Sequence, residues 1–118
     1  MKIKKIAEIL NAEILTDYSD ENTDIIYGFA SDLMSDVLAY ANSESLLVTG
    51  LNNAQVIRTA EMMDMSTVLF VRGKIPCNEV IELATEKSIT VLKTNYTMFK
   101  TCGILAINGM RGIESNDW

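Results

Sequence analysis

Three short apolar runs in the second half of the chain each end in small or polar residues and lead into a segment with helical spacing of apolar side chains. The runs cover residues 45–49, 67–71 and 89–92, so each begins 22 residues after the one before. Strand, loop and helix recurring at this length favour a parallel sheet. Residues 46–48 are apolar without alternation, as in a strand that is covered on both faces. We therefore predict a mostly parallel sheet with helices on both faces.

The first part of the chain predicts an N-terminal helix followed by two further strands. Asn11 can end this helix in the left-handed conformation that asparagine tolerates. Residues 12–15 read as a short strand, and residues 25–30 read as a longer one. The apolar face of the helix has the spacing i, i+3, i+4, i+7 and consists of Ile3, Ile6, Ala7 and Leu10.

Polar residues or proline precede each of the later predicted helices. Small side chains with an oxygen atom can accept hydrogen bonds from the first N–H groups of a helix, and proline suits the first turn. The candidates are Ser31 or Ser35, Asn52 or Asn53, and Thr94 as caps, with Pro76 in a first turn.

The length of 118 residues is enough for one domain and one core. We expect a single domain over residues 1–110 with the architecture of a three-layer α/β/α sandwich. Residues 111–118 show no periodicity, and we expect them to form a flexible C-terminal tail.

If the strands are parallel, the loops that follow them share one edge of the sheet, where open α/β folds bind ligands. Gly50 and Gly73 let a ligand approach the backbone closely, and Arg72, Lys74 and Lys93 provide positive charge. We interpret this edge as a candidate site for a small anionic or nucleotide-like ligand, although turn chemistry alone also explains such residues. The predicted ligand-binding residues are Ser31, Thr49, Gly50, Asn52, Asn53, Arg72, Gly73, Lys74, Thr94 and Asn95.

The composition excludes several classes of function. A net charge of −6 without a basic patch argues against binding to nucleic acid polymers or anionic membranes. The chain has no histidine, so no Ser–His or Cys–His dyad can form. The P-loop and dinucleotide-binding motifs are absent, and we expect no cofactor and no metal. Asp32 and Asp36 have a spacing that could hold a metal, but helix capping and solvation explain them more simply.

The two cysteines bear on the cellular compartment of the protein, and the seven methionines bear on its possible contact surfaces. Cys77 and Cys102 fall at apolar positions of predicted helices, so we expect buried, reduced thiols. With no signal peptide evident, this favours a cytoplasmic protein. Residues 62–65 include three methionines and could form an adaptable contact surface.

Several short motifs resemble those of the DRTGG domain family over nearly the whole chain. They are residues 32–40 (DLMSDVLAY), 47–50 (LVTG), 71–73 (VRG) and 94–99 (TNYTMF). The chain departs from the residues that name the family, because it has Gly50-Leu51-Asn52 in place of Gly-Asp-Arg and residues 71–73 in place of Thr-Gly-Gly. The resemblance implies a fold similar to the N-terminal domain of HPr kinase/phosphorylase, without its kinase active site. It also implies a regulatory accessory domain that forms homo-oligomers, with a dimer as the first expectation.

The leading hypothesis is therefore a non-enzymatic regulatory or ligand-sensing domain. One alternative is a protein-interaction subunit that docks on a metabolic or redox enzyme complex, through a surface around residues 62–65. A second alternative is an enzyme that acts on a phosphorylated metabolite through Asp32, Lys74 or Lys93.

Overall fold

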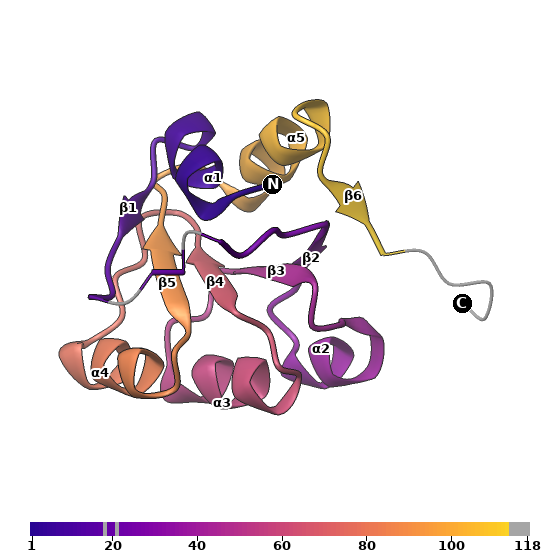
Figure 1. Cartoon of the computed structure of the whole chain (residues 1–118). Coiled ribbons are helices and arrows are strands. Elements are labelled where there is room, and N and C mark those ends of the chain that lie inside the picture. Colours follow the sequence, from indigo (N-terminus) through magenta and orange to yellow (C-terminus); the bar gives the residue numbers. More distant parts are fainter. Residues whose placement is uncertain (18, 21, 114–118) are drawn as a thin grey trace.

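The computed structural model describes residues 1–17, 19–20 and 22–113. Within these residues six strands form one sheet in the order β1-β5-β4-β3-β2-β6 (Figure 1). Five strands are mutually parallel, and β1 pairs antiparallel with β5 at one edge. The strands are β1 (Glu13–Ile14), β2 (Tyr27–Ala30), β3 (Ser45–Thr49), β4 (Thr67–Phe70), β5 (Thr90–Lys93) and β6 (Arg111–Gly112).

Helices cover both faces of the sheet, which confirms the predicted three-layer α/β/α sandwich. Helices α2, α3 and α4 lie on one face, and α1 and α5 lie on the other (Figure 1). Their bounds are α1 (Ile3–Ile9), α2 (Met34–Tyr40), α3 (Ala54–Met62), α4 (Asn78–Glu86) and α5 (Met98–Ile107). No helix of the described residues is long and apolar enough to cross a bilayer.

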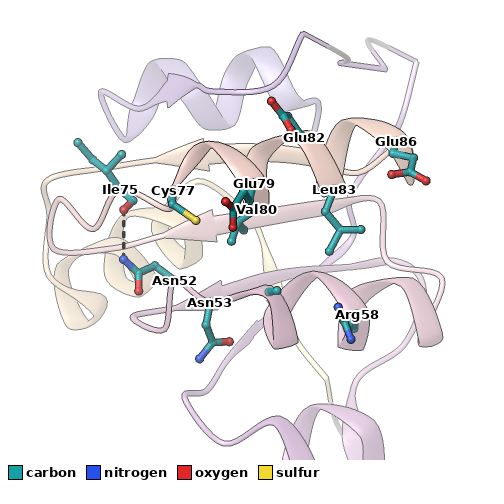
Figure 2. Close-up of a pocket in the computed structure, with 11 residues that line it drawn as sticks. Asn52, Asn53, Arg58, Ile75, Cys77, Glu79, Val80, Glu82, Leu83 and Glu86 are labelled. Carbon is teal, nitrogen blue, oxygen red and sulfur yellow. Dashed lines mark hydrogen bonds between the residues drawn. The ribbon is translucent and has the colours of Figure 1, made fainter.

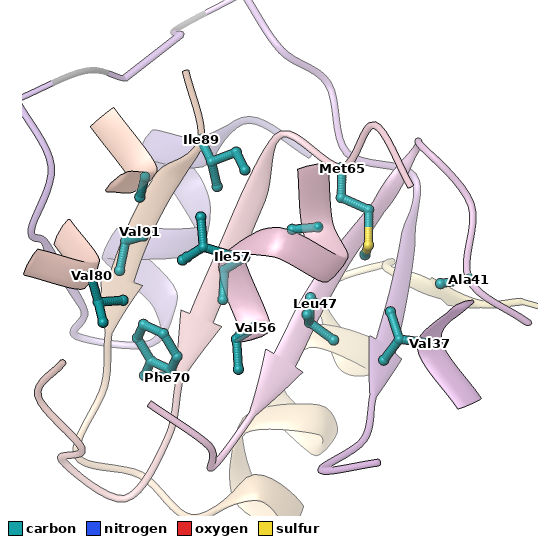
Figure 3. Close-up of a cluster of buried hydrophobic side chains, with 13 residues drawn as sticks. Val37, Ala41, Leu47, Val56, Ile57, Met65, Phe70, Val80, Ile89 and Val91 are labelled. Atoms are coloured by element: carbon teal, nitrogen blue, oxygen red, sulfur yellow. The ribbon is translucent and has the colours of Figure 1, made fainter. Parts of the chain in front are cut away.

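Two apolar clusters, one on each face of the sheet, form the core. All five residues of β3 are buried, because this strand is covered from both sides. Leu47 points toward α2, α3 and α4 and packs with Val37 and Phe70 (Figure 3). Its neighbours Leu46 and Val48 belong to the cluster under α1 and α5. The apolar run without alternation therefore arises from a strand that contributes to both clusters.

The strand boundaries differ slightly from the predicted ones, and one strand was not predicted. β2 begins at Tyr27 instead of residue 25, and β5 runs to Lys93. The expected tail was wrong at its start, because residues 111 and 112 form β6 and pair in parallel with Tyr27 and Gly28. The ordered chain thus continues past the predicted boundary at residue 110, and residues 114–118 of the expected tail lie outside the described residues.

Helix starts agree less well with the predicted caps. Asn11 has φ of +48°, which confirms the left-handed end of α1. The N-cap of α2 is Leu33, and neither Ser31 nor Ser35 caps it: the Ser31 hydroxyl accepts from the Leu33 N–H at 3.0 Å in the turn before the helix. Pro76 also lies outside its helix, since α4 begins at Asn78.

Candidate functional site

The loops that follow the parallel strands lie side by side along one edge of the sheet, which we call the rim. Ser31 N–H donates to Val48 C=O at 3.0 Å, and Val71 N–H donates to Thr49 C=O at 3.1 Å. Arg72 N–H donates to Tyr96 C=O at 2.8 Å, which ties the loop after β4 to the loop after β5. The prediction that remote turns meet at one edge is therefore confirmed, because β2, β3, β4 and β5 run in the same direction.

Asp32 joins the first two of these loops. Its Oδ1 accepts from the Thr49 hydroxyl at 3.0 Å and from the Gly50 N–H at 2.7 Å. The Thr49 hydroxyl also accepts from the Leu51 N–H at 3.2 Å, and Thr49 is fully buried. Thr49 therefore holds the rim together, and its hydroxyl proton is already used within the protein.

Thr94 has a similar internal role at the other end of the rim. Its hydroxyl donates to the Leu10 C=O at 2.8 Å and accepts from the Tyr96 N–H at 3.3 Å, and the residue is buried. The expectation that Thr94 caps the next helix was wrong. Thr97 is the N-cap of α5, where its hydroxyl accepts from the Lys100 N–H at 3.3 Å.

The loop after β4 carries the exposed positive charge of the rim. Arg72 and Gly73 both have positive φ, +60° and +67°, so the chain turns sharply here. The Arg72 guanidinium lies over the backbone of Gly50, where an added Cβ would collide with Nη2. Close beside it, the Asn95 side-chain oxygen lies 3.0 Å from the place of a Cβ on Gly73. Both glycines thus permit side chains of a neighbouring loop to approach the backbone.

The two other cations are arranged differently. Lys74 is exposed in the same loop as Arg72. Lys93 is half-buried within β5 and pairs in the sheet with Glu13 of β1, so it belongs to a strand instead of a loop. The rim therefore has two exposed cations on one loop, and the third lies toward the edge strand β1.

Asn52 and Asn53 lie at the border of an open groove of about 770 Å³ between α3 and α4 (Figure 2). The Asn52 amide donates to the Ile75 C=O at 3.1 Å, and Asn53 is the N-cap of α3 without a side-chain hydrogen bond to the helix. The other eight predicted site residues are not among the residues that line this groove.

The sequence analysis did not predict this groove, and its charge differs from that of the rim. Glu79, Glu82 and Glu86 line it from α4, and Arg58 lines it from α3. The spacing of the three glutamates, i, i+3 and i+7, was the available signal, since it places them on one side of a helix. The groove is thus net acidic, and phosphate groups are disfavoured inside it.

The cysteines and methionines are less buried than expected. Cys77 is exposed and lines the groove, and Cys102 is half-buried within α5. Burial raises the pKa of the Cys102 thiol. Met65 is buried in the core, whereas Met62 is 69% exposed. The contact surface expected around residues 62–65 is therefore reduced to Met62 with the half-buried Met63 beside it.

No group of three or more potential metal ligands occurs among the residues that the structure describes. The pair Asp32 and Asp36, with the spacing of metal ligands, is also explained by other contacts. Asp32 binds the loop after β3, and Asp36 lies in the first turn of α2, where the helix dipole favours a negative charge.

Comparison with known proteins places the chain in a family. The sequence profile of the DRTGG domain matches residues 5–107. A crystal structure of the CBS and DRTGG domains of the regulatory region of Clostridium perfringens pyrophosphatase, complexed with the activator diadenosine tetraphosphate, superposes with a TM-score of 0.72 at 15% sequence identity. The match covers 98% of this chain and 51% of that one, so this chain spans about half of the regulatory region. No curated protein matches in sequence. With a family profile that covers most of the sequence and the same fold in a solved relative, the chain belongs to the DRTGG domain family.

Proposed function

We propose that the protein is a non-enzymatic regulatory domain that binds a small anionic or nucleotide-like ligand at the rim. The observation that carries the proposal is the exposed Arg72 guanidinium above Gly50, where β3 and β4 end side by side. A guanidinium presents several N–H donors in a fixed plane and suits phosphate oxygens. The structural relative, a regulatory region that binds a dinucleotide activator, supports this ligand class.

The charges around the rim favour one side of it for the ligand. Arg72 and Lys74 lie on the loop after β4, whereas the groove between α3 and α4 carries three glutamates. Because the whole chain is acidic, an anion is drawn to the local positive charge and away from the groove. We therefore expect the phosphate groups to bind near Arg72 and not between the helices.

The site geometry supports binding more than catalysis. Asp32 Oδ1 already accepts two hydrogen bonds, and the Thr49 and Thr94 hydroxyls donate within the protein. Lys93 lies within β5. Of the three groups named for an enzyme, Asp32 is engaged in structural hydrogen bonds, Lys93 lies within a strand, and Lys74 is exposed on the loop where we place the ligand, which favours a sensor over a catalyst.

Calorimetry with a panel of nucleotides, including ATP and diadenosine tetraphosphate, tests this proposal. Arg72→Gln removes the guanidinium, and we expect the affinity to fall about tenfold to a hundredfold, because a charge-assisted hydrogen bond contributes ~1.5–3 kcal/mol. Lys4→Gln is the matched control, since it removes one exposed positive charge from α1. Arg58→Gln removes the positive charge that lines the groove between α3 and α4, so it tests whether the ligand binds there.

Two results would contradict the proposal. One is a complete lack of binding heat and of thermal shift across the panel. The other is an equal loss of affinity in Arg72→Gln and Lys4→Gln, which would show a response to net charge and not to a site. A loss of affinity that is confined to Arg58→Gln would indicate that the ligand binds in the groove and not at the rim.

A further inference from the structure

A small apolar cleft lies between α5 and the edge of the sheet formed by β2 and β6. It has a volume of about 190 Å³, and none of the predicted ligand-binding residues lines it. The buried side chains of Val48 and Leu105 line it, and Cys102 and Ala106 line it from α5. Because an apolar cavity of ~150 Å³ holds a benzene ring, this cleft has room for one ring or a short alkyl chain.

The end of β6 leaves this cleft open to solvent. Pairing between β6 and β2 stops at Gly28 and Gly112, so Ala30 has no strand partner on the outer edge of β2 among the described residues. Ala30 and Ala106 both line the cleft and are both exposed. Gly28 lets Met110 pack directly on the strand, since an added Cβ would lie 3.1 Å from the Met110 Sδ. A ligand can therefore enter between the helix and the strand edge.

The lining of the cleft contains one cation and no anion. Among the described residues that line it, Arg111 alone is charged, and its side chain is exposed. Arg111 forms no ion pair with another described residue. A guanidinium presents paired N–H donors in one plane, which match the two oxygens of a carboxylate. The cleft therefore combines an apolar interior with a donor group for an anion.

A second hollow, of about 280 Å³, adjoins the cleft, because Met110 and Arg111 line both. Lys5 of α1 also lines this hollow and is exposed, and it has no ion pair with a described residue. No described carboxylate lines either hollow. In a chain of net charge −6, two unpaired cations at one place make the local potential more positive. An anionic group beside Arg111 is thus favoured over a neutral one.

We propose that this cleft binds a small carboxylate with an apolar body, with the ring or alkyl chain between α5 and β2 and the carboxylate on Arg111. The cleft is smaller than the ~300–1,000 Å³ of pockets for drug-sized ligands, so the apolar body is about as large as one ring. Aromatic and short-chain carboxylates meet both requirements. The site shares no lining residue with the predicted rim site, so it does not depend on nucleotide binding at the rim.

Alkylation of Cys102 in the presence of phenylacetate tests the proposal, because this cysteine lines the cleft. The alkylation rates of both cysteines are measured by mass spectrometry with and without phenylacetate. Cys77 is the internal control, since it lines the groove on the other face of the sheet (Figure 1). We expect the Cys102 rate to fall about tenfold once phenylacetate reaches about ten times its Kd, and the Cys77 rate to stay unchanged.

Two analogues and three variants separate the parts of the site. Phenylacetamide lacks the charge and acetate lacks the ring, so neither should protect Cys102 at the same concentration. Arg111→Gln should raise the phenylacetate concentration for half-maximal protection about tenfold, because it removes a charge-assisted hydrogen bond. Lys4→Gln is the matched control, since Lys4 is exposed and lines neither hollow. Ala106→Leu should abolish protection by filling the cleft from an exposed position where leucine suits the helix, and circular dichroism checks that the fold is kept.

Several results would overturn the proposal. One is an unchanged Cys102 rate at the highest phenylacetate concentration. Equal protection by phenylacetamide or by acetate would show that ring and charge are not read together, and an equal effect of Arg111→Gln and Lys4→Gln would show a response to net charge. Protection of Cys102 by ATP and not by phenylacetate would assign the cleft to a nucleotide. Calorimetry with nucleotides reports on the rim separately, so a failure of the proposed function leaves the outcome at Cys102 unchanged.

Discussion

Replacing Asp32 by alanine should loosen the rim at the point where the loops after β2 and β3 meet. Asp32 Oδ1 accepts from the Thr49 hydroxyl at 3.0 Å and from the Gly50 N–H at 2.7 Å. Alanine removes both acceptors at once. Thr49 is fully buried, so its hydroxyl is left without this acceptor where water cannot easily replace it.

The expected cost in free energy of unfolding is about 2 kcal/mol. A buried donor that loses its acceptor costs ~1–3 kcal/mol, and hydrogen bonds to a charged group contribute ~1.5–3 kcal/mol. Asp32 is itself exposed, so water competes for its carboxylate, and we expect the total cost to lie toward the lower end of these two ranges combined. Asp32→Asn keeps an oxygen acceptor at the same position, and we expect it to cost less than about 1 kcal/mol.

Urea unfolding followed by circular dichroism measures these differences. Glu82→Ala is the control for loss of one carboxylate, since Glu82 is exposed on α4, and it should change stability by less than about 0.5 kcal/mol. The double variant Asp32→Ala/Thr49→Val should cost less than the sum of the single changes, because both remove the same hydrogen bond. Strictly additive costs, or an Asp32→Ala variant as stable as Glu82→Ala, would refute the assigned role.

Two further predictions concern α5 and the thiols. Thr97→Ala should destabilise the protein by ~1 kcal/mol in the same assay, because Thr97 is the N-cap whose hydroxyl accepts from a backbone N–H of the first turn; an unchanged midpoint would argue against this cap. Cys102 should be alkylated more slowly than the exposed Cys77 when both are followed by mass spectrometry. Its rate should keep rising with pH beyond the ordinary thiol pKa of 9.0, because burial favours the neutral thiol and raises its pKa. The same shift stabilises the fold below pH 9.0, and this contribution is lost as the pH rises through the raised pKa. Equal alkylation rates for the two cysteines would contradict the burial of Cys102.

The amphipathic pattern was a good guide to the elements that form the core. The run at residues 45–49 is the fully buried central strand β3, and the parallel direction of β2 to β5 follows from the helices between them. These features can be predicted from short stretches of sequence, because a strand that contributes to both clusters must be apolar throughout. Because parallel strands end at the same edge of the sheet, the loops that follow them must meet there, as predicted.

Helix starts and side-chain roles were harder to predict. Thr94 and Thr97 are the same residue type three positions apart, and both precede the helix. Thr94 turns inward to the C=O of Leu10, whereas Thr97 caps the helix. Which threonine caps depends on where α1 ends in space, and residues near Thr94 in the sequence carry no information about that.

By itself, the sequence determined a parallel α/β/α domain with a polar rim at the ends of its strands, because burial on both faces and recurrent helices leave a direct pattern of apolar residues. The resemblance to the DRTGG family came separately, from the short motifs at residues 32–40, 47–50, 71–73 and 94–99. Only the tertiary structure decided that the two-residue strand β6 extends the sheet at one edge, that β1 pairs antiparallel at the other, that Thr49 and Thr94 face inward, that an acidic groove opens between α3 and α4, and that α5 leaves Phe99 uncovered. The physical reason is that these features depend on contacts between residues far apart in the chain, and a two-residue strand or a single exposed side chain has no periodicity from which to predict it.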